Sequence, residues 1–437
     1  MAGQSKTYCI LPFVHSHASV SGHWKPCCNS VVSENSRALN LYNDKGHTHK
    51  TWFESPRMDL LRKNLSSGVR DPMCSICWKS EDVSGASMRT RYSDGSIDNA
   101  KFGHIIKEQR VKEKLTRKKD KELKIKYLDL KIGNECNLKC RMCDYTNSSK
   151  ILEDVVAIEN DKSLELPIEW HRSPRHEAVM DEKGIKSMPE RAVREIIDDI
   201  LPDLRVLKVT GGEPMVQRQV LELFKVCVDK GYAKNIELYI TTNGTKFTKK
   251  FMEGIRTFKK VSFDVSCDGY GKVYDYIRYP FNWKKFAQRV DEVIKASKEQ
   301  KRSMPITICP LAQMYNIETL HKLQKWTSEF NETNVDFYCN TFLQPLTSYN
   351  SLRNVPVDIL EYAHERIIET PNTVTLTRYL ESLIKDKKAG NIIVDESTER
   401  LIYNSVKAKD KIRNQRFSDF VGPRTSKWLE GIFKKYA

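Results

Sequence analysis

Three cysteines close together in the sequence are the residues best suited to chemistry. The segment GNECNLKCRMCDY places Cys136, Cys140 and Cys143 in a C-x3-C-x2-C run. Thiolates at these offsets on a tight loop can each bind one iron of a cubane cluster, which leaves the fourth iron without a protein ligand. Four ligands would close a tetrahedral site, whereas three leave a coordination position open for a molecule that reacts. A zinc ion completed by a distant Cys or His is the alternative.

A glycine pair followed by an acidic residue forms a second element of this kind. The segment TGGEP, residues 210–214, follows an apolar run and opens a helical pattern. Two glycines let the backbone approach a ligand closely, and the carboxylate of Glu213 suits an ammonium group. An ordinary turn between a strand and a helix is the alternative for a Gly-Gly pair taken alone.

Together these two elements resemble the signature of the radical S-adenosylmethionine (SAM) superfamily, and the resemblance covers residues 127–345. It implies a 4Fe–4S cluster on the three cysteines, whose open iron chelates the amino and carboxylate groups of SAM. It also implies reductive cleavage of SAM to methionine and a 5′-deoxyadenosyl radical, which abstracts a hydrogen atom from a substrate. The residue before the last cysteine is commonly aromatic in this superfamily and is Met142 here.

The resemblance further implies SAM contacts at the ends of successive strands. TTNG (241–244) is similar to the family's third strand ending, and VSCDG (265–269) is similar to the fourth, which serves the ribose or carboxylate of SAM. Arg278, in the YIR that follows, is expected to pair with the SAM carboxylate. Ordinary turn chemistry is the alternative at each position. The expected SAM contacts are Gly211, Gly212, Glu213, Pro214, Thr242, Asn243, Ser266, Asp268 and Arg278.

A second set of cysteines lies near the N-terminus. CILPFVHSHASVSGHWKPCC has the pattern of two strands joined by a turn, so pairing across this hairpin brings Cys9 close to Cys27. A C-x2-C pair, Cys74 and Cys77, follows further along the chain. Four thiolates from a hairpin and such a pair can close a tetrahedral set.

This second set resembles the SPASM/twitch auxiliary-cluster module of radical SAM enzymes, which implies a second, fully ligated 4Fe–4S cluster. Zinc is the alternative. The module normally follows the barrel and here precedes it, so its role in electron transfer or substrate handling is an expectation. Cys28 either replaces Cys27 as a ligand or remains a buried thiol. The hairpin histidines His15, His17 and His23 are expected on strand faces rather than on a metal.

Six short apolar runs alternate with helical patterns in the rest of the chain. These runs are 127–133, 204–210, 236–242, 261–267, 306–312 and 335–341. Strand–helix alternation predicts β-α-β units and a parallel sheet. The expected fold class is α/β, a partial (β/α)6 TIM-like barrel with a small N-terminal Cys-rich β-hairpin module and a helical C-terminal region. Residues 145–185 lack a clear period and are expected to form a lid or a substrate-contacting loop.

The expected boundaries follow from these patterns. They are 1–100 for the SPASM/twitch-like module, 101–126 for a basic helical linker, 127–345 for the radical SAM core and 346–437 for the helical C-terminal region.

Composition narrows the class of protein. The chain has no run of 18 apolar residues and no signal-peptide pattern at its start, which predicts a cytoplasmic protein without a membrane helix. Disulfides are rare in that compartment, so 12 cysteines favour metal binding or catalysis. Much of the net charge of +16 comes from residues 107–126, where interspersed charges favour a solvated helix over a nucleic-acid patch.

The leading interpretation is therefore an enzyme that uses SAM, an electron donor such as flavodoxin or ferredoxin, and a peptide or small-molecule substrate. The residues that carry out the substrate chemistry are not identifiable from the sequence. The alternative is a zinc- or cluster-bearing nucleic-acid-binding protein that uses its basic stretch. That stretch lacks aromatic residues on which bases could stack.

Overall fold

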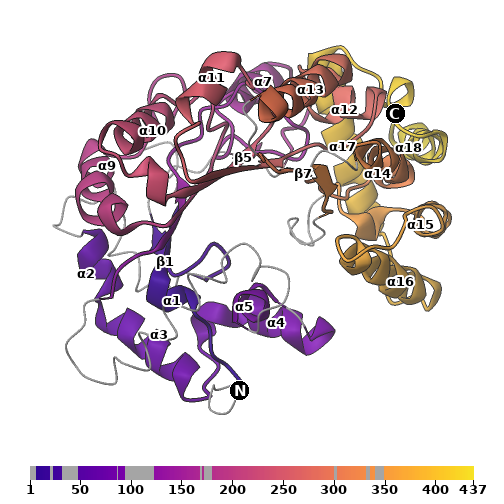
Figure 1. Ribbon diagram of the computed structural model, residues 1–437. Coiled ribbons are helices and arrows are strands. Elements are labelled where there is room, and N and C mark those ends of the chain that lie inside the picture. The colour runs from indigo at the N-terminus through magenta and orange to yellow at the C-terminus, as the bar shows by residue number, and fades with distance from the viewer. Residues whose placement is uncertain are drawn as a thin grey trace.

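A single curved sheet organises the molecule, as the computed structural model in Figure 1 shows. Its eight strands lie in the order β2-β1-β3-β4-β5-β6-β7-β8. Strand β2 pairs antiparallel with β1, and the other neighbouring strands are parallel. The structure describes residues 6–19, 23–31, 48–85, 87–93, 123–167, 170–171, 180–299, 303–330, 335–339 and 349–437.

The six strands predicted from apolar runs are confirmed as β3 to β8. The strands are β1 (His15–Ala18), β2 (Trp24–Lys25), β3 (Tyr127–Lys131), β4 (Val206–Thr210), β5 (Glu237–Thr242), β6 (Lys260–Val265), β7 (Ile306–Ile308) and β8 (Val335–Phe337). The fold is thus mixed α/β with a mostly parallel sheet, consistent with a partial TIM-like barrel.

The N-terminal hairpin differs from expectation because it belongs to this same sheet. Strand β1 pairs in parallel with β3, which places His17 opposite Asp129. All four residues of β1 are buried, as in a strand covered on both faces. The turn expected between these two strands falls on residues 20–22, which lie outside the described residues. The hairpin is therefore an extension of the barrel sheet rather than a separate small sheet.

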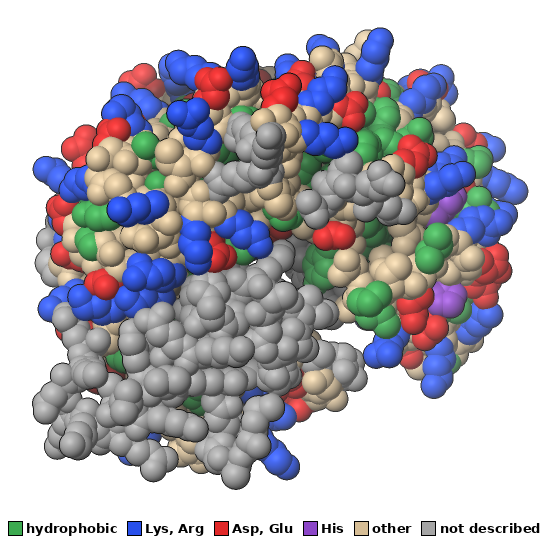
Figure 2. Space-filling view, viewed as in Figure 1, with side chains coloured by type: hydrophobic (Ala, Val, Ile, Leu, Met, Phe, Trp, Pro, Cys, Tyr) green, Lys and Arg blue, Asp and Glu red, His purple; other side chains and the backbone are tan. Residues whose placement is uncertain are grey.

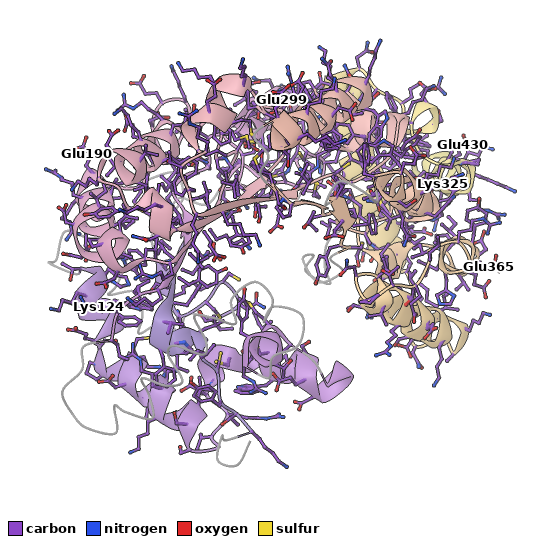
Figure 3. All side chains as sticks on the ribbon, in the orientation of Figure 1. Lys124, Glu190, Glu299, Lys325, Glu365 and Glu430 are labelled. Atoms are coloured by element: carbon purple, nitrogen blue, oxygen red, sulfur yellow. The ribbon has the colours of Figure 1, made fainter. Side chains whose placement is uncertain are left out.

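Helices of the β-α-β units cover the convex face of the sheet (Figure 1). Helix α10 (Arg218–Asp229) buries Val220, Leu223, Phe224 and Cys227, the spacing of one helical face. Cys227 is thus a core residue. The other helices here are α9 (Glu190–Glu195), α11 (Lys249–Gly254), α12 (Lys272–Ile277), α13 (Trp283–Glu299) and α14 (Leu320–Ser328). In Figure 3 the labelled Glu190, Glu299 and Lys325 lie on this outer side.

Short helices surround the N-terminal cysteines, and longer ones form the C-terminal region. The former are α1 (Leu11–Val14), α2 (His49–Phe53), α3 (Pro56–Ser66), α4 (Ser75–Ser84) and α5 (Met88–Ser93). The latter are α15 (Val357–His364), α16 (Val374–Lys388), α17 (Glu396–Arg413) and α18 (Pro423–Tyr436), which confirms the helices predicted there. Asp395 caps the start of α17, because its carboxylate accepts the Thr398 amide. Asn414 caps the end of this helix in the left-handed conformation.

The segment 145–185, expected as a loop, contains helix α7 (Ile151–Glu159). Ile151, Val155 and Ile158 of this helix form a small second core with Trp170 and with Ala408 of α17. This segment is thus packed against the C-terminal region, which its irregular sequence pattern did not indicate.

The basic stretch predicted as a linker lies largely outside the described residues, which resume at residue 123. On the face shown in Figure 2, Lys and Arg side chains are interspersed with Asp and Glu. Among the described residues, no helix has the length and apolar character needed to cross a bilayer.

Candidate functional site

The three-cysteine loop follows β3 directly, at the carboxyl end of the parallel strands. Asn134 fixes its start, because the buried amide donates to the carbonyl oxygens of Tyr145 and Gly184, both at 3.0 Å. Its Oδ1 accepts the Lys186 amide at 2.7 Å. Asn134 thus ties the loop to the segment that follows it.

The glycine pair lets TGGEP pack against this loop. The amide of Gly212 donates to the Gly133 carbonyl at 3.0 Å, and the amide of Glu213 donates to the Glu135 carbonyl at 2.8 Å. A Cβ on Gly212 would lie 2.2 Å from the Glu135 carbonyl oxygen. Gly211 has a φ of 142°, where side chains are disfavoured. We expected the glycines to admit a ligand; their observed close neighbour is the backbone of the cysteine loop.

Glu213 joins the ends of two strands. It is fully buried, and its carboxylate accepts the Thr242 hydroxyl at 2.7 Å, the Asn243 amide at 2.6 Å and the Met215 amide at 3.1 Å. Burial raises the pKa of this carboxyl, and the hydrogen bonds from Asn243 and Thr242 oppose that rise. The carboxylate therefore already has three donors in the protein, so an ammonium group would be an additional partner.

Two side chains bring N–H groups to the cysteine sulfurs. The side-chain nitrogen Nδ2 of Asn243 lies 3.9 Å from Cys136 Sγ and donates to Asn137 Oδ1 at 2.9 Å. Arg278 Nη1 lies 3.5 Å from Cys140 Sγ. Hydrogen bonds of this kind compensate the charge of metal-bound thiolates and tune cluster potentials.

Arg278 also forms an ion pair that the sequence did not predict. Its Nε donates to Asp268 Oδ2 at 2.5 Å, and the other carboxylate oxygen of Asp268 accepts the Leu311 amide at 2.7 Å. Arg278 and Asp268 were expected to contact SAM separately. In the structure they form one unit beside Cys140.

The remaining predicted contacts lie close by. Pro214 is buried and Ser266 is half-buried. The Ser266 amide donates to the Thr242 carbonyl at 2.8 Å, which ties β6 to β5. The structure thus brings the cysteine loop, GGEP and TTNG into contact, and Arg278 and Asp268 reach the loop through Cys140.

The donor set fits an iron–sulfur cluster. Burial raises the pKa of Cys136 to about 12 and also raises the pKa of Cys140, where Arg278 opposes the shift. Thiols in such surroundings ionise when a metal binds them, and the neighbouring N–H groups then stabilise the thiolates. Among the described side chains, no group of three His, Cys, Asp or Glu residues converges on a single metal-ion position.

The four N-terminal cysteines proposed as ligands line one small cavity. It is lined by Cys9, Leu11, Pro12, Pro26, Cys27, Asn29, Ser30, Cys74, Cys77, Met88 and Arg89. Burial is the main cause that raises the pKa of Cys27, and the neighbouring cysteines raise it further. The structure therefore brings together residues from α1, α4 and α5 and from the segment that follows β2.

Cys28 has different surroundings from its neighbour. Its sulfur lies 3.7 Å from Met88 Sδ, and it is not among the described residues that line the cavity. The Cys28 side chain is exposed, so the expectation that it remains a buried thiol is wrong. Between the two adjacent cysteines, Cys27 is the one that lines the four-thiol cavity.

Two features of the site escaped the sequence analysis. Gln217 is buried, and its amide donates to the Gly133 and Glu135 carbonyls at 3.2 and 3.3 Å, which further fixes the cysteine loop. The only available signal was its place shortly after GGEP. Asp129, on β3, forms an ion pair with His17 at 3.3 Å. Burial raises the pKa of Asp129, but the nearby His17 and Lys208 lower it by a larger amount, so that this pKa lies below its usual range.

The inner face of the sheet is consequently polar. Alternate residues of a strand point to opposite faces, and Leu128 and Leu130 of β3 are fully buried in the core. Asp129 between them, and Lys208 on the neighbouring strand β4, lie opposite each other in register. In the sequence, the signal for this polar face was a charged residue, Asp129 or Lys208, within an otherwise apolar run.

The radical SAM superfamily matches residues 130–326. A 7,8-dihydro-6-hydroxymethylpterin dimethyltransferase of Methanocaldococcus jannaschii is 28% identical over 148 residues, which are 32% of this chain and 28% of the relative.

Two solved structures are among those that align with the chain. Native anSMEcpe with bound AdoMet has 15% identity and a TM-score of 0.36, with 61% of this chain and 63% of that chain covered. Streptococcus suis SuiB bound to S-adenosylmethionine has 15% identity and a TM-score of 0.32, with 68% and 60% covered.

The cysteine loop and GGEP both fall inside the matched range. Residues 130–326 therefore match the radical SAM superfamily, which supports an enzyme, and the chain spans less than a third of the length of the curated relative.

Proposed function

We propose that this enzyme reductively cleaves SAM and uses the resulting 5′-deoxyadenosyl radical to abstract a hydrogen atom from its substrate. The observation that carries the proposal is the packing of the loop with Cys136, Cys140 and Cys143 against GGEP at the carboxyl ends of β3 and β4. A 4Fe–4S cluster on these thiolates supplies an electron and an open coordination position when it is bound.

The chain's own residues hold the loop and provide the surroundings for SAM. Glu213 links GGEP to TTNG, so that both segments keep a fixed distance from the cysteines. Arg278, supported by Asp268, places a guanidinium beside Cys140, where the carboxylate of SAM would also lie. We assign the SAM contacts to Gly211, Gly212, Glu213, Pro214, Thr242, Asn243, Ser266, Asp268 and Arg278.

The four-thiol cavity is proposed to hold a second 4Fe–4S cluster, on Cys9, Cys27, Cys74 and Cys77. Support comes from the convergence of four thiols from separate segments on one cavity. A fully ligated cluster suits electron transfer or contact with the substrate rather than SAM chelation, which needs an open position. Zinc in this cavity is the alternative.

The substrate is proposed to be a peptide or a polar small molecule. Asp129 and Lys208 on the inner face of the sheet favour a substrate with polar or charged groups. The electron would come from a small redox protein such as flavodoxin or ferredoxin.

The test is anaerobic reconstitution with iron and sulfide, followed by measurement of 5′-deoxyadenosine under reducing conditions. The wild-type chain should form it, and Cys140→Ala should not. Cys227→Ala is the matched control, because this buried cysteine lies in helix α10. A Cys140→Ala protein that forms 5′-deoxyadenosine at the wild-type rate would overturn the proposal.

A further inference from the structure

The C-terminal helix α17 contacts the cysteine loop, although the two segments are far apart in the chain. The contact begins at Arg141, which lies between Cys140 and Cys143 and is fully buried. Its Nη2 donates to Asp410 Oδ1 at 2.5 Å and to Gln415 Oε1 at 2.9 Å. Its Nε donates to the Tyr276 carbonyl at 2.9 Å, so Arg141 bridges α12 and α17.

A second cation from α17 reaches the backbone of the same loop. Lys409 is fully buried, and its Nζ lies 3.2 Å from the Arg141 carbonyl oxygen and 2.8 Å from the Tyr349 hydroxyl. The Tyr349 hydroxyl donates to the same carbonyl at 2.9 Å. The peptide between Cys140 and Cys143 is therefore held from the C-terminal side by a charged group.

Trp170 connects the same helix to the last cysteine. Its indole nitrogen donates to the Cys143 carbonyl at 2.8 Å, and its ring lies 4.5 Å from Lys409 Nζ. The Arg413 guanidinium lies 5.9 Å from that ring and donates to Asp154 at 2.9 Å. Two buried cations of α17, Lys409 and Arg413, thus lie near the cysteine loop, which itself carries the buried Arg141.

Burying charge is a costly way to attach a helix. Buried ion pairs are often no more stabilising than apolar packing of similar volume, so attachment alone does not account for these groups. Their charge has a use at an iron–sulfur cluster, whose potential depends on nearby charge and burial. A positive charge favours the more negative, reduced form, and such an interaction is weakly screened inside a protein.

We propose that Lys409 and Asp410 of α17 are positioning residues for the SAM-binding cluster, and that their charges set its reduction potential. Lys409 raises this potential and Asp410 lowers it. Together with Arg141 they also hold the peptide between the cysteines. The inference rests on the proposed function, since it requires the cluster on Cys136, Cys140 and Cys143.

The test is a redox titration of the SAM-sensitive cluster signal by electron paramagnetic resonance. Lys409→Met removes the positive charge at similar length and should make the midpoint potential more negative. Asp410→Asn removes a negative charge at the same shape and should make it more positive. Lys409→Arg should restore the wild-type value. Lys407→Met is the control, since Lys407 lies on the same helix and contacts the Tyr403 ring at 5.2 Å.

Loosening of the structure cannot produce shifts of opposite sign from two neighbouring residues. Shifts in the same direction, or none, in variants with full iron content would therefore overturn the inference. If Lys409→Met loses its iron, Asp410→Asn alone decides, and the absence of a positive shift there overturns it. A wild-type protein without any SAM-sensitive signal would instead overturn the proposed function.

Discussion

The two cysteine sites differ in what surrounds their sulfur atoms. The loop of Cys136 and Cys140 is approached by N–H groups of Asn243 and Arg278, and buried cations lie behind it. The N-terminal thiols line a cavity whose other walls include apolar Leu11, Pro12, Pro26 and Met88 and the guanidinium of Arg89. Three thiols leave a coordination position open for a polar ligand, whereas four thiols can ligate every iron of a cluster.

They also differ in how the chain builds them. The three-cysteine loop is one short segment after β3. The backbone that follows β4 donates to it, and the Asn243 side chain after β5 donates to Asn137. The N-terminal cavity collects cysteines from separate short segments around α1, β2 and α4. A bound metal in the N-terminal cavity would therefore add a link between segments that are also held together by apolar packing and by the Arg89 hydrogen bond to the Tyr8 carbonyl at 2.7 Å.

The largest expected difference concerns metal content. If both sites hold cubanes, the wild-type chain should bind about eight irons, and Cys74→Ala combined with Cys77→Ala should leave about four. An anaerobic assay of iron, zinc and sulfide measures this. About four irons and one zinc in the wild-type chain would show that the N-terminal site is a zinc site and leave the loop site intact.

A substitution at Gly212 should remove iron from the three-cysteine loop and leave the iron of the N-terminal site in place. The added Cβ would lie 2.2 Å from the Glu135 carbonyl and displace the cysteine loop, so Gly212→Ala should lose the iron of that loop and keep the other about four. The matched control is Gly254→Ala, where a Cβ meets nothing within 4 Å. Equal iron content in Gly212→Ala and wild type would mean that the packing of GGEP on the loop is not required.

A smaller effect is expected at Glu213. Glu213→Ala removes the acceptor of the Thr242 hydroxyl and the Asn243 amide, and should lower the free energy of unfolding by about 1–3 kcal/mol. If Glu213 also contacts SAM, its loss should weaken SAM binding by about 1.5–3 kcal/mol. Denaturant unfolding and SAM titration of the reconstituted protein measure the two effects.

Glu222→Ala is the control for this experiment, because Glu222 forms an exposed pair with Arg218 on α10. Exposed pairs of this kind contribute little to stability. Intact iron content with unchanged SAM affinity in Glu213→Ala would show that Glu213 has a structural role only.

The sequence predicted the local features well. Strands β3 to β8 and helix α10 follow from apolar runs and from one-face spacing, which depend on neighbouring residues only. The convergence of the cysteine loop and GGEP follows from their places after parallel strands, since such strands end at the same edge of a sheet.

What escaped prediction depends on contacts between distant segments. The pairing of β1 with β3, the bond from Arg141 to Asp410 and the packing of Trp170 all join residues with no local pattern in common. The role of Gly212 escaped for a related reason. A glycine signals a close approach, but only the fold shows which partner approaches it.

The central claim is that the loop with Cys140 and Cys143 holds the cluster with the open position, while the N-terminal site does not. The most direct measurement compares the electron paramagnetic resonance spectra of two reduced proteins before and after addition of SAM. One protein carries Cys74→Ala and Cys77→Ala, and the other carries Cys140→Ala and Cys143→Ala. We predict that SAM changes the spectrum of the first protein only. A SAM-dependent change in the second protein, with none in the first, would contradict the account.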